Sequence, residues 1–278
     1  MKIEKIKTQD YLGLHSLSFG TIENSTCYIV VHGLGSSLWS HVELADELVT
    51  NTSSVLLFNN RGFGIMNTIK STHLVTGIKE RKICGAAFEV FEESVFDIEG
   101  AIQLAKEQGA KEIVLIGFST GSNKIIHYLK KNNQGIIKKA ILASPLSDYL
   151  DAVKQTSKST VDEVVQKATS ITSENKDLIS FLGSYWSKQR ILSLFSSDSI
   201  EQCFKYHMPN SKYSTFITIS TKLKFIIGEK DECADRPIQE IQNWFERNKK
   251  PNDTVTIIPD ATHSLKGFEM QLAHIIQA

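Results

Sequence analysis

A serine between two glycines is the side chain in this sequence with the clearest chemical potential. An apolar, β-branched run at 113–116 leads into Gly-Phe-Ser-Thr-Gly at 117–121, and a segment with helical spacing follows. This order predicts a strand, a tight turn and a helix, the setting in which Gly-x-Ser-x-Gly forms a nucleophile elbow. Glycine at both flanking positions removes Cβ atoms that would clash in so sharp a turn. We therefore predict that Ser119 is a nucleophile.

A serine hydroxyl is a poor nucleophile at neutral pH, so it needs a base, and the base needs an orienting acid. Asp231 follows the apolar run 223–227, and His263 follows the run 255–258. The carboxyl ends of parallel strands lie along one edge of a sheet, which places both side chains on the edge that carries Ser119. The chain order Ser, Asp, His is also the order that this architecture uses. We predict a triad of Ser119, Asp231 and His263.

Other interpretations of the acid and the base stay open. His263 also fits an exposed loop histidine, and Asp231 also fits a surface charge or a helix-start carboxylate. Asp148, which follows the preceding strand, is an alternative acid. Three further carboxylates share the loop of Asp231: Glu229, Glu232 and Asp235.

The oxyanion of an acyl-transfer intermediate needs two backbone N–H donors near the serine. The first is predicted to be Thr120, which directly follows the nucleophile. The second is predicted to be Leu34, in the His-Gly-Leu-Gly stretch 32–35 that follows the apolar run 26–31. A plain glycine-containing turn is the alternative interpretation of that stretch. His127, on the helix after the elbow, fits a packed or exposed helix residue better than a catalytic one.

These residues must be positioned by alternating strands and helices. Continuous rather than alternating apolar runs predict parallel strands that are covered on both faces. Strands are expected at 26–31, 53–58, 113–116, 140–144, 223–227 and 255–258, after an antiparallel hairpin at 3–6 and 12–19. Helices are expected at 39–48, 88–108, 238–247 and 266–277, besides the helix after the elbow. The fold class is therefore α/β, with a mostly parallel, doubly wound sheet.

Two long segments interrupt this pattern. Residues 146–221 are rich in Ser, Thr, Lys and Asp, with modest helical periodicity at 161–168 and 178–185. We predict that 146–221 form a small helical cap, inserted after the sixth strand into a core of 1–145 and 222–278, and that this cap folds over Ser119. Residues 65–87 show little periodicity, which predicts a functional or mobile loop.

The composition limits the kinds of molecule that the protein is expected to bind. The chain has 278 residues, and 31 Lys and Arg balance 31 Asp and Glu, which argues against a general nucleic-acid or membrane-surface binder. The first ten residues lack the apolar stretch of a signal peptide, no run reaches transmembrane length, and four cysteines lie far apart. These features indicate reduced thiols in a cytoplasmic protein. No His-x-x-x-His or paired-cysteine pattern is present, so we expect neither a metal nor another cofactor.

With the stretches 32–35 and 117–121, Asp231 and His263, the chain resembles the α/β-hydrolase superfamily over nearly its whole length. Gly-Phe-Ser-Thr-Gly-Ser at 117–122, Ile-His-Tyr-Leu at 126–129 and His-Ser-Leu-Lys-Gly at 263–267 also resemble the siderophore ester hydrolases of the fusarinine esterase type and their bacterial relatives. That resemblance implies cleavage of hydroxamate siderophore esters through a Ser-Asp-His triad. Asn60 stands near the usual acid of the superfamily's Asp-x-Arg-Gly turn.

The leading hypothesis is a serine hydrolase that cleaves a small-molecule carboxylic ester through an acyl-enzyme. Acyl transfer or thioester hydrolysis would use the same triad. A non-catalytic ligand receptor on this fold is the third hypothesis, although such proteins usually lose a triad member and none is lost here. The sequence leaves the acyl group and the oligomeric state open.

Overall fold

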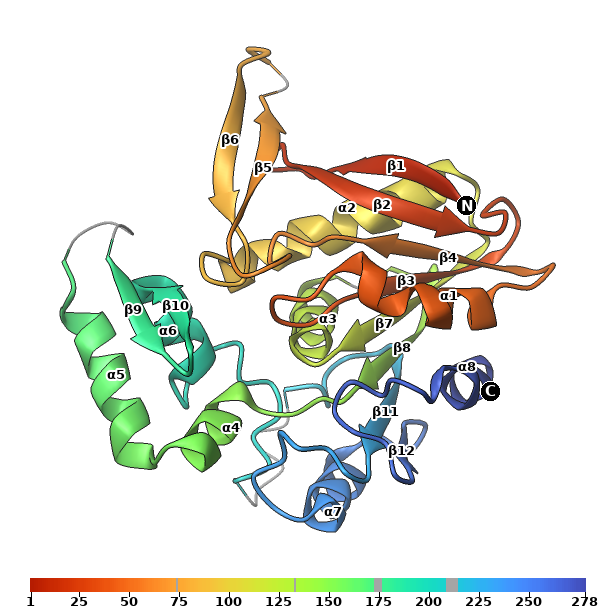
Figure 1. Cartoon of the computed structure of the whole chain (residues 1–278). Coiled ribbons are helices and arrows are strands. Elements are labelled where there is room, and N and C mark those ends of the chain that lie inside the picture. The colour runs from red at the N-terminus through yellow and green to blue at the C-terminus, as the bar shows by residue number, and fades with distance from the viewer. Residues whose placement is uncertain (74, 133, 173–176, 209–214) are drawn as a thin grey trace.

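The computed structural model describes residues 1–73, 75–132, 134–172, 177–208 and 215–278, and a twisted eight-stranded sheet forms its centre (Figure 1). The strands follow the order β1-β2-β4-β3-β7-β8-β11-β12. Their bounds are β1 Lys2–Lys7, β2 Gly13–Phe19, β3 Thr26–Val31, β4 Ser53–Phe58, β7 Glu112–Phe118, β8 Ile137–Ala143, β11 Lys222–Gly228 and β12 Thr254–Ile258. Only β2 pairs antiparallel with its neighbours, β1 and β4, while the other pairs in this sheet are parallel. The predicted α/β class with a mostly parallel sheet is confirmed.

Helices cover both faces of this sheet. On one face, α1 packs against α8, and on the other, α2 packs against the elbow helix α3. The helix bounds are α1 Val42–Leu48, α2 Ser94–Glu107, α3 Thr120–Lys131, α7 Ile238–Asn248 and α8 Glu269–Gln277, with short 3-10 helices η1 Leu38–His41 and η2 Phe91–Glu93. Successive residues of β3 face opposite sides of the sheet. Ile29 packs into the apolar core on the α2–α3 side, and Val30 packs into the apolar core on the α1–α8 side. Two-sided burial explains the continuous apolar runs.

Two helix predictions were wrong at their starts. The helix expected from residue 88 begins at Ser94, after η2. The helix expected from residue 39 begins at Val42, and Trp39 lies in η1 with 64% of its surface exposed. In both cases a 3-10 turn directly precedes the α-helix. The spacing of the side chains in this turn resembles that of the helix, so the sequence pattern does not separate the two elements.

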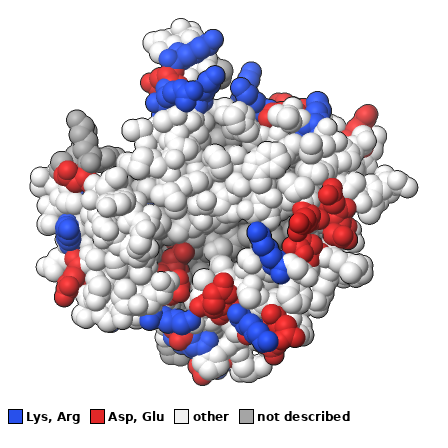
Figure 2. All heavy atoms as spheres, in the orientation of Figure 1, with Lys and Arg blue, Asp and Glu red and all other residues white. Residues whose placement is uncertain are grey.

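The loop predicted at 65–87 is instead largely a β-hairpin. Strands β5 (Asn67–Thr72) and β6 (Lys79–Cys84) pair antiparallel and project from the body of the molecule (Figure 1). Most of their side chains are exposed, so neither face needs apolar residues and no period of two appears in the sequence. Figure 2 shows Lys and Arg side chains gathered on this hairpin, where the sequence has Lys70, Lys79, Arg81 and Lys82.

The insertion between β8 and β11, residues 146–221, lies to one side of the sheet (Figure 1). Its elements are α4 Asp148–Gln155, α5 Lys158–Ser170, β9 Leu178–Phe181, β10 Ser184–Ser187 and α6 Lys188–Phe195. The helical periodicity expected at 178–185 was wrong, because this stretch is the two-stranded sheet β9–β10. Leu182 and Gly183 reverse the chain with positive φ angles of 48° and 70°. Residues 173–176 and 209–214 of the predicted cap lie outside the described residues.

Among the described residues, no helix has both the length and the apolar character that crossing a membrane requires. All four cysteines are free thiols. The division into a core and a cap domain remains a prediction.

Candidate active site

Ser119 occupies the sharp turn between β7 and α3, with φ 51° and ψ −123°. A side chain other than glycine rarely adopts a positive φ, and such strain is typical of functional turns. The flanking glycines are required by packing: a Cβ on Gly117 would lie 2.6 Å from the carbonyl carbon of Gly121, and a Cβ on Gly121 would lie 2.1 Å from the carbonyl oxygen of Val31. The elbow geometry that the sequence predicts is therefore present.

The fold brings the three predicted triad residues together. His263 Nε2 lies 2.9 Å from Ser119 Oγ, and His263 Nδ1 lies 2.9 Å from each carboxylate oxygen of Asp231. All three distances have the length of a good hydrogen bond. In this arrangement, Nδ1–H donates to Asp231 and the Nε2 lone pair accepts from the serine hydroxyl, as general-base activation of a serine requires.

The acid and base loops lie close together because glycine ends β11. A Cβ on Gly228 would lie 2.4 Å from the carbonyl oxygen of Ala261, and the backbone N–H of Lys230 donates to that same oxygen at 2.9 Å. The loop after β11 is thus in backbone contact with the loop after β12. This contact sets the separation between Asp231 and His263.

Two residues that the sequence analysis did not assign to this task hold the backbone of His263. Ser144, directly after β8, donates its hydroxyl to the carbonyl oxygen of His263 at 2.7 Å. The carboxylate of Glu232 accepts from the N–H of His263 at 2.9 Å. Ser144 has a positive φ of 48°, which is uncommon for serine. Nothing in the residue type predicts that conformation, so only the fold reveals this role.

Asp231 stabilises the positive charge that His263 acquires when it takes up a proton. Burial alone would lower the pKa of His263, but the hydrogen bond to Asp231 outweighs it and the pKa lies above its usual value. The imidazole keeps about 20% of its surface exposed, whereas the Asp231 side chain is fully buried. A buried carboxylate beside Nδ1 stabilises the imidazolium that forms when the base takes the serine proton.

Asp148, the alternative acid, lies at the start of α4. Within the described residues the imidazole of His263 hydrogen-bonds to Asp231, and no such bond joins it to Asp148. Asp148 is partly buried. The loss of water around its carboxyl group raises its pKa to about 7, and the Glu201 carboxylate acts in the same direction. The geometry therefore favours Asp231 as the acid.

The predicted oxyanion loop lies against the elbow. A Cβ on Gly33 would lie 3.0 Å from Ser119 Cβ, so Leu34 follows at a point where the chain touches the nucleophile. His32 and Asn60 fix this loop: the N–H of Asn60 donates to His32 Nε2 at 3.1 Å, and its side-chain amide donates to the His32 carbonyl at 3.0 Å. Asn60 thus fills a structural position. The roles of the Leu34 and Thr120 N–H groups remain predictions.

A buried ion cluster joins the elbow helix to the insertion. Lys124 on α3 pairs with Glu89 at 2.6 Å, and Arg190 on α6 lies 3.3 Å from Glu89 and 2.5 Å from Glu201. All four side chains have 1% or less of their surface exposed. Sequence reasoning missed this cluster because Glu89, Lys124 and the pair Arg190–Glu201 come from three separate parts of the chain.

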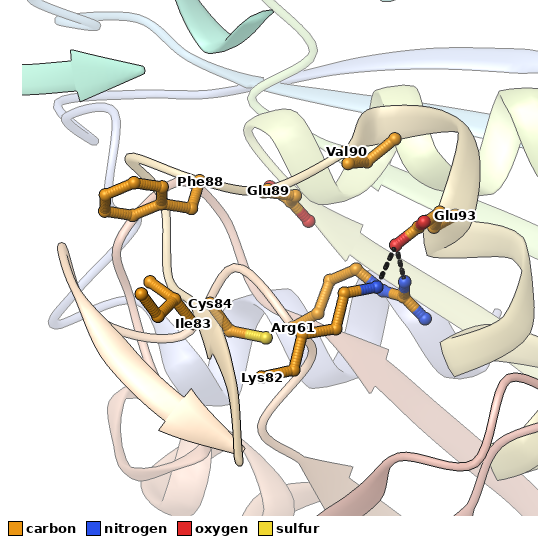
Figure 3. Close-up of a pocket in the computed structure, with 8 residues that line it drawn as sticks. All are labelled: Arg61, Lys82, Ile83, Cys84, Phe88, Glu89, Val90 and Glu93. Carbon is orange, nitrogen blue, oxygen red and sulfur yellow. Dashed lines mark hydrogen bonds and ion pairs between the residues drawn. The ribbon is translucent and has the colours of Figure 1, made fainter. Parts of the chain in front are cut away.

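A small pocket beside the projecting hairpin contains none of the triad residues (Figure 3). Its lining residues are Arg61, Lys82, Ile83, Cys84, Phe88, Glu89, Val90 and Glu93. Arg61 and Lys82 both contact Glu93, and Arg61 also pairs with Asp97 at 2.7 Å. Because these charges satisfy one another, we assign no chemistry to this pocket.

One group of side chains at the triad has metal-ligating character. The ligand atoms of Asp231, Cys233 and His263 all lie within 4.8 Å of one another. The sequence showed no such cluster, because the histidine is far from the other two residues in the chain. The fold assembles it when the two loops meet.

Comparison with solved structures shows where this fold occurs. The siderophore hydrolase EstB from Aspergillus fumigatus is 16% identical, with 99% of this chain and 96% of that chain covered and a TM-score of 0.65. An esterase from Pyrococcus furiosus is 21% identical, with 99% and 88% covered and a TM-score of 0.61. An esterase from Butyrivibrio proteoclasticus with bound ferulic acid is 12% identical, with 99% and 96% covered and a TM-score of 0.62. These similarities show that the chain has the α/β-hydrolase fold.

Sequence comparison gives a narrower assignment. No curated protein sequence matches the chain. Residues 92–277 match the family described as "Protein of unknown function (DUF1749)", and this range contains Ser119, Asp231 and His263. Since the match spans more than half of the sequence, the chain belongs to the DUF1749 family.

Proposed function

We propose that this protein is a serine hydrolase that cleaves carboxylic esters of small molecules. The observation that carries the proposal is the continuous hydrogen-bonded path from Ser119 Oγ through His263 to Asp231. The nucleophile, the base and the acid are all present, each at the end of a different strand of an α/β-hydrolase sheet. Esterases among the structures with this fold give the proposal further support.

The reaction begins when Ser119 Oγ attacks the ester carbonyl and His263 Nε2 takes the serine proton. Asp231 holds the imidazole in the required tautomer and balances the charge of the imidazolium. The backbone N–H groups of Thr120 and Leu34 stabilise the oxyanion. His263 then gives its proton to the departing alcohol, and an acyl group stays on Ser119. Water, activated by the same histidine, releases the acid and restores the enzyme.

The narrower part of the proposal concerns the substrate class. The similarity to a siderophore hydrolase, together with the stretches 117–122 and 263–267, supports an ester of the hydroxamate siderophore type. A direct check is to compare the kcat/KM for a hydroxamate siderophore ester with that for a simple aliphatic ester of similar size. Equal values for the two would reject the siderophore class and leave ester hydrolysis in place.

Labelling with a fluorophosphonate probe tests the nucleophile. The wild-type protein should be labelled at Ser119, and Ser119→Ala should not be labelled. Hydrolysis of p-nitrophenyl acetate, followed in parallel, should disappear in the same variant. A wild-type protein that is folded, unlabelled and inactive on a panel of esters would instead indicate a non-catalytic ligand receptor.

A further inference from the structure

Cys233 is a feature of the triad region that the ester-cleaving mechanism does not use. It lies two residues after Asp231, and its backbone N–H donates to the Asp231 carboxylate at 3.0 Å. This short turn carries the thiol toward the triad, so that its sulfur, a carboxylate oxygen of Asp231 and a ring nitrogen of His263 fall within 4.8 Å of one another. Nδ1 is the ring nitrogen that contacts the Asp231 carboxylate. Cys233 and His263 are both partly exposed, whereas Asp231 is buried.

These three groups are the ligand types that Zn²⁺ prefers. A thiolate, an imidazole nitrogen and a carboxylate oxygen, with a fourth position open to water, make a common zinc donor set. With bonds of about 2.0–2.3 Å in a tetrahedron, the ligand atoms lie roughly 3.3–3.8 Å apart. The imidazole and the carboxylate, 2.9 Å apart in this structure, would have to separate slightly to admit the ion. The sulfur would approach by a small rotation of the Cys233 side chain.

We propose that Asp231, Cys233 and His263 form an inhibitory site for Zn²⁺. This regulation rests on the proposed hydrolase function, because the ion takes the two groups that activate Ser119. The native hydrogen bond between His263 and Asp231 must break for the ion to bind. That competition makes the metal a reversible inhibitor instead of a permanent component of the site.

The proton balance explains the inhibition. In the form of the free enzyme that can activate Ser119, Nδ1 of His263 carries a proton and Nε2 has a free lone pair. When Zn²⁺ binds Nδ1, that proton moves through solvent to Nε2, and the Cys233 thiol releases its proton to solvent as it becomes a thiolate ligand. Nε2–H then donates to Ser119 Oγ and has no lone pair with which to accept the serine proton. The nucleophile is left without a base.

Direct metal binding is measured in a background that cannot hydrolyse esters. Ser119→Ala, titrated with Co²⁺ as a spectroscopic substitute for Zn²⁺, should show one cobalt bound per chain and a near-ultraviolet thiolate-to-cobalt absorption band. Added Zn²⁺ should displace the Co²⁺ and remove the absorption band. The double variant Ser119→Ala with Cys233→Ser should lack the band, whereas Ser119→Ala with Cys84→Ser should keep it, because Cys84 lies away from the triad.

Inhibition is measured on p-nitrophenyl acetate, with each variant compared with its own metal-free rate. Zn²⁺ should inhibit the wild-type protein, EDTA should restore the rate, and Cys233→Ser should need at least about tenfold more Zn²⁺ for the same inhibition. Equal inhibition of the wild type and Cys233→Ser would overturn the proposal, as would the absence of the cobalt band in Ser119→Ala. If the wild type hydrolyses no ester, the hydrolase function fails, but the cobalt titration still decides whether the metal site exists.

Discussion

The backbone around Ser119 is constrained at two residues. Ser119 has a φ of 51°, and the elbow packs onto Val31 through Gly121, where any side chain would collide. The proposed nucleophile, acid and base were chosen from residue type and chain order, because each follows an apolar strand, and the fold brings these three side chains together. The positions of Ser144 and Cys233 beside His263 could not be predicted in this way, because these residues meet His263 only when separate loops come together in the fold.

Replacing the nucleophile should separate chemistry from folding. Ser119→Ala removes only a hydroxyl, so the circular dichroism spectrum and the melting temperature should stay close to those of the wild type. The kcat for p-nitrophenyl acetate should fall by a factor on the order of 10⁶. Retention of more than about a tenth of the wild-type rate in purified protein would show that another residue is the nucleophile.

The identity of the acid can be tested by two matched amide substitutions. Asp231→Asn should lower kcat by a factor on the order of 10⁴, because an amide favours the wrong histidine tautomer and does not stabilise the imidazolium. Asp148→Asn removes an equivalent carboxyl group that has no hydrogen bond to the imidazole, so its effect on kcat should be far smaller. If the two variants ranked in the opposite order, the acid would belong to the loop after β8.

At the scale of elements, the contact between the insertion and the sheet domain depends on charge as well as on apolar packing. Arg190 on α6 reaches across to Glu89 while it pairs with Glu201 in its own segment. Within the insertion, Trp186 is buried and packs edge-on against Phe195. The apolar pattern of the sequence predicted the insertion as a structured segment. It did not reveal β9–β10, which is too short for a clear period, or the ion cluster, whose members are distant in sequence.

Breaking this cluster should destabilise the protein strongly. Arg190→Met leaves Glu89 and Glu201 buried with less compensating charge, which should lower the free energy of unfolding by about 3–5 kcal/mol. Lys158→Met is the control, because Lys158 forms an exposed ion pair with Asp162, and such pairs contribute about 1 kcal/mol or less. Urea unfolding of both variants measures the free energy of unfolding. A similar decrease in the two variants would show that the buried cluster stabilises the protein no more than an exposed ion pair does.

At the scale of the whole molecule, the formal charge is zero, yet single groups inside it couple its stability to pH. Asp148 is the clearest case, since burial raises its pKa from 3.8 to about 7 in the folded protein. Four charged groups act on it: Glu201, Arg190, His263 and Asp151. Length, composition and the order of the strands predicted the fold class. They could not predict which groups link stability to pH, because that depends on how far each side chain lies from water in the folded protein.

The folded protein therefore binds a proton at Asp148 that the unfolded chain releases above its lower pKa. This group's contribution to stability should fall as the pH rises from 3.8 to about 7 and change little above that. Asp148→Asn cannot ionise, so its melting temperature relative to the wild type should rise between pH 5 and pH 8. Asp162→Asn, at an exposed position, controls for the loss of one negative charge. A constant difference between Asp148→Asn and wild type across this range would contradict the assignment.

The three strands that precede the proposed triad residues are synthesised in a fixed order. Ser119 is synthesised first, and His263 lies 144 positions later in the chain. β12, the last of these strands in the sequence, pairs in parallel with β11. The contact between His263 and Ser119 can therefore form only after β12 and the loop that follows it have been synthesised. In the proposed hydrolase, esterase activity requires that this loop has docked beside the loop after β11.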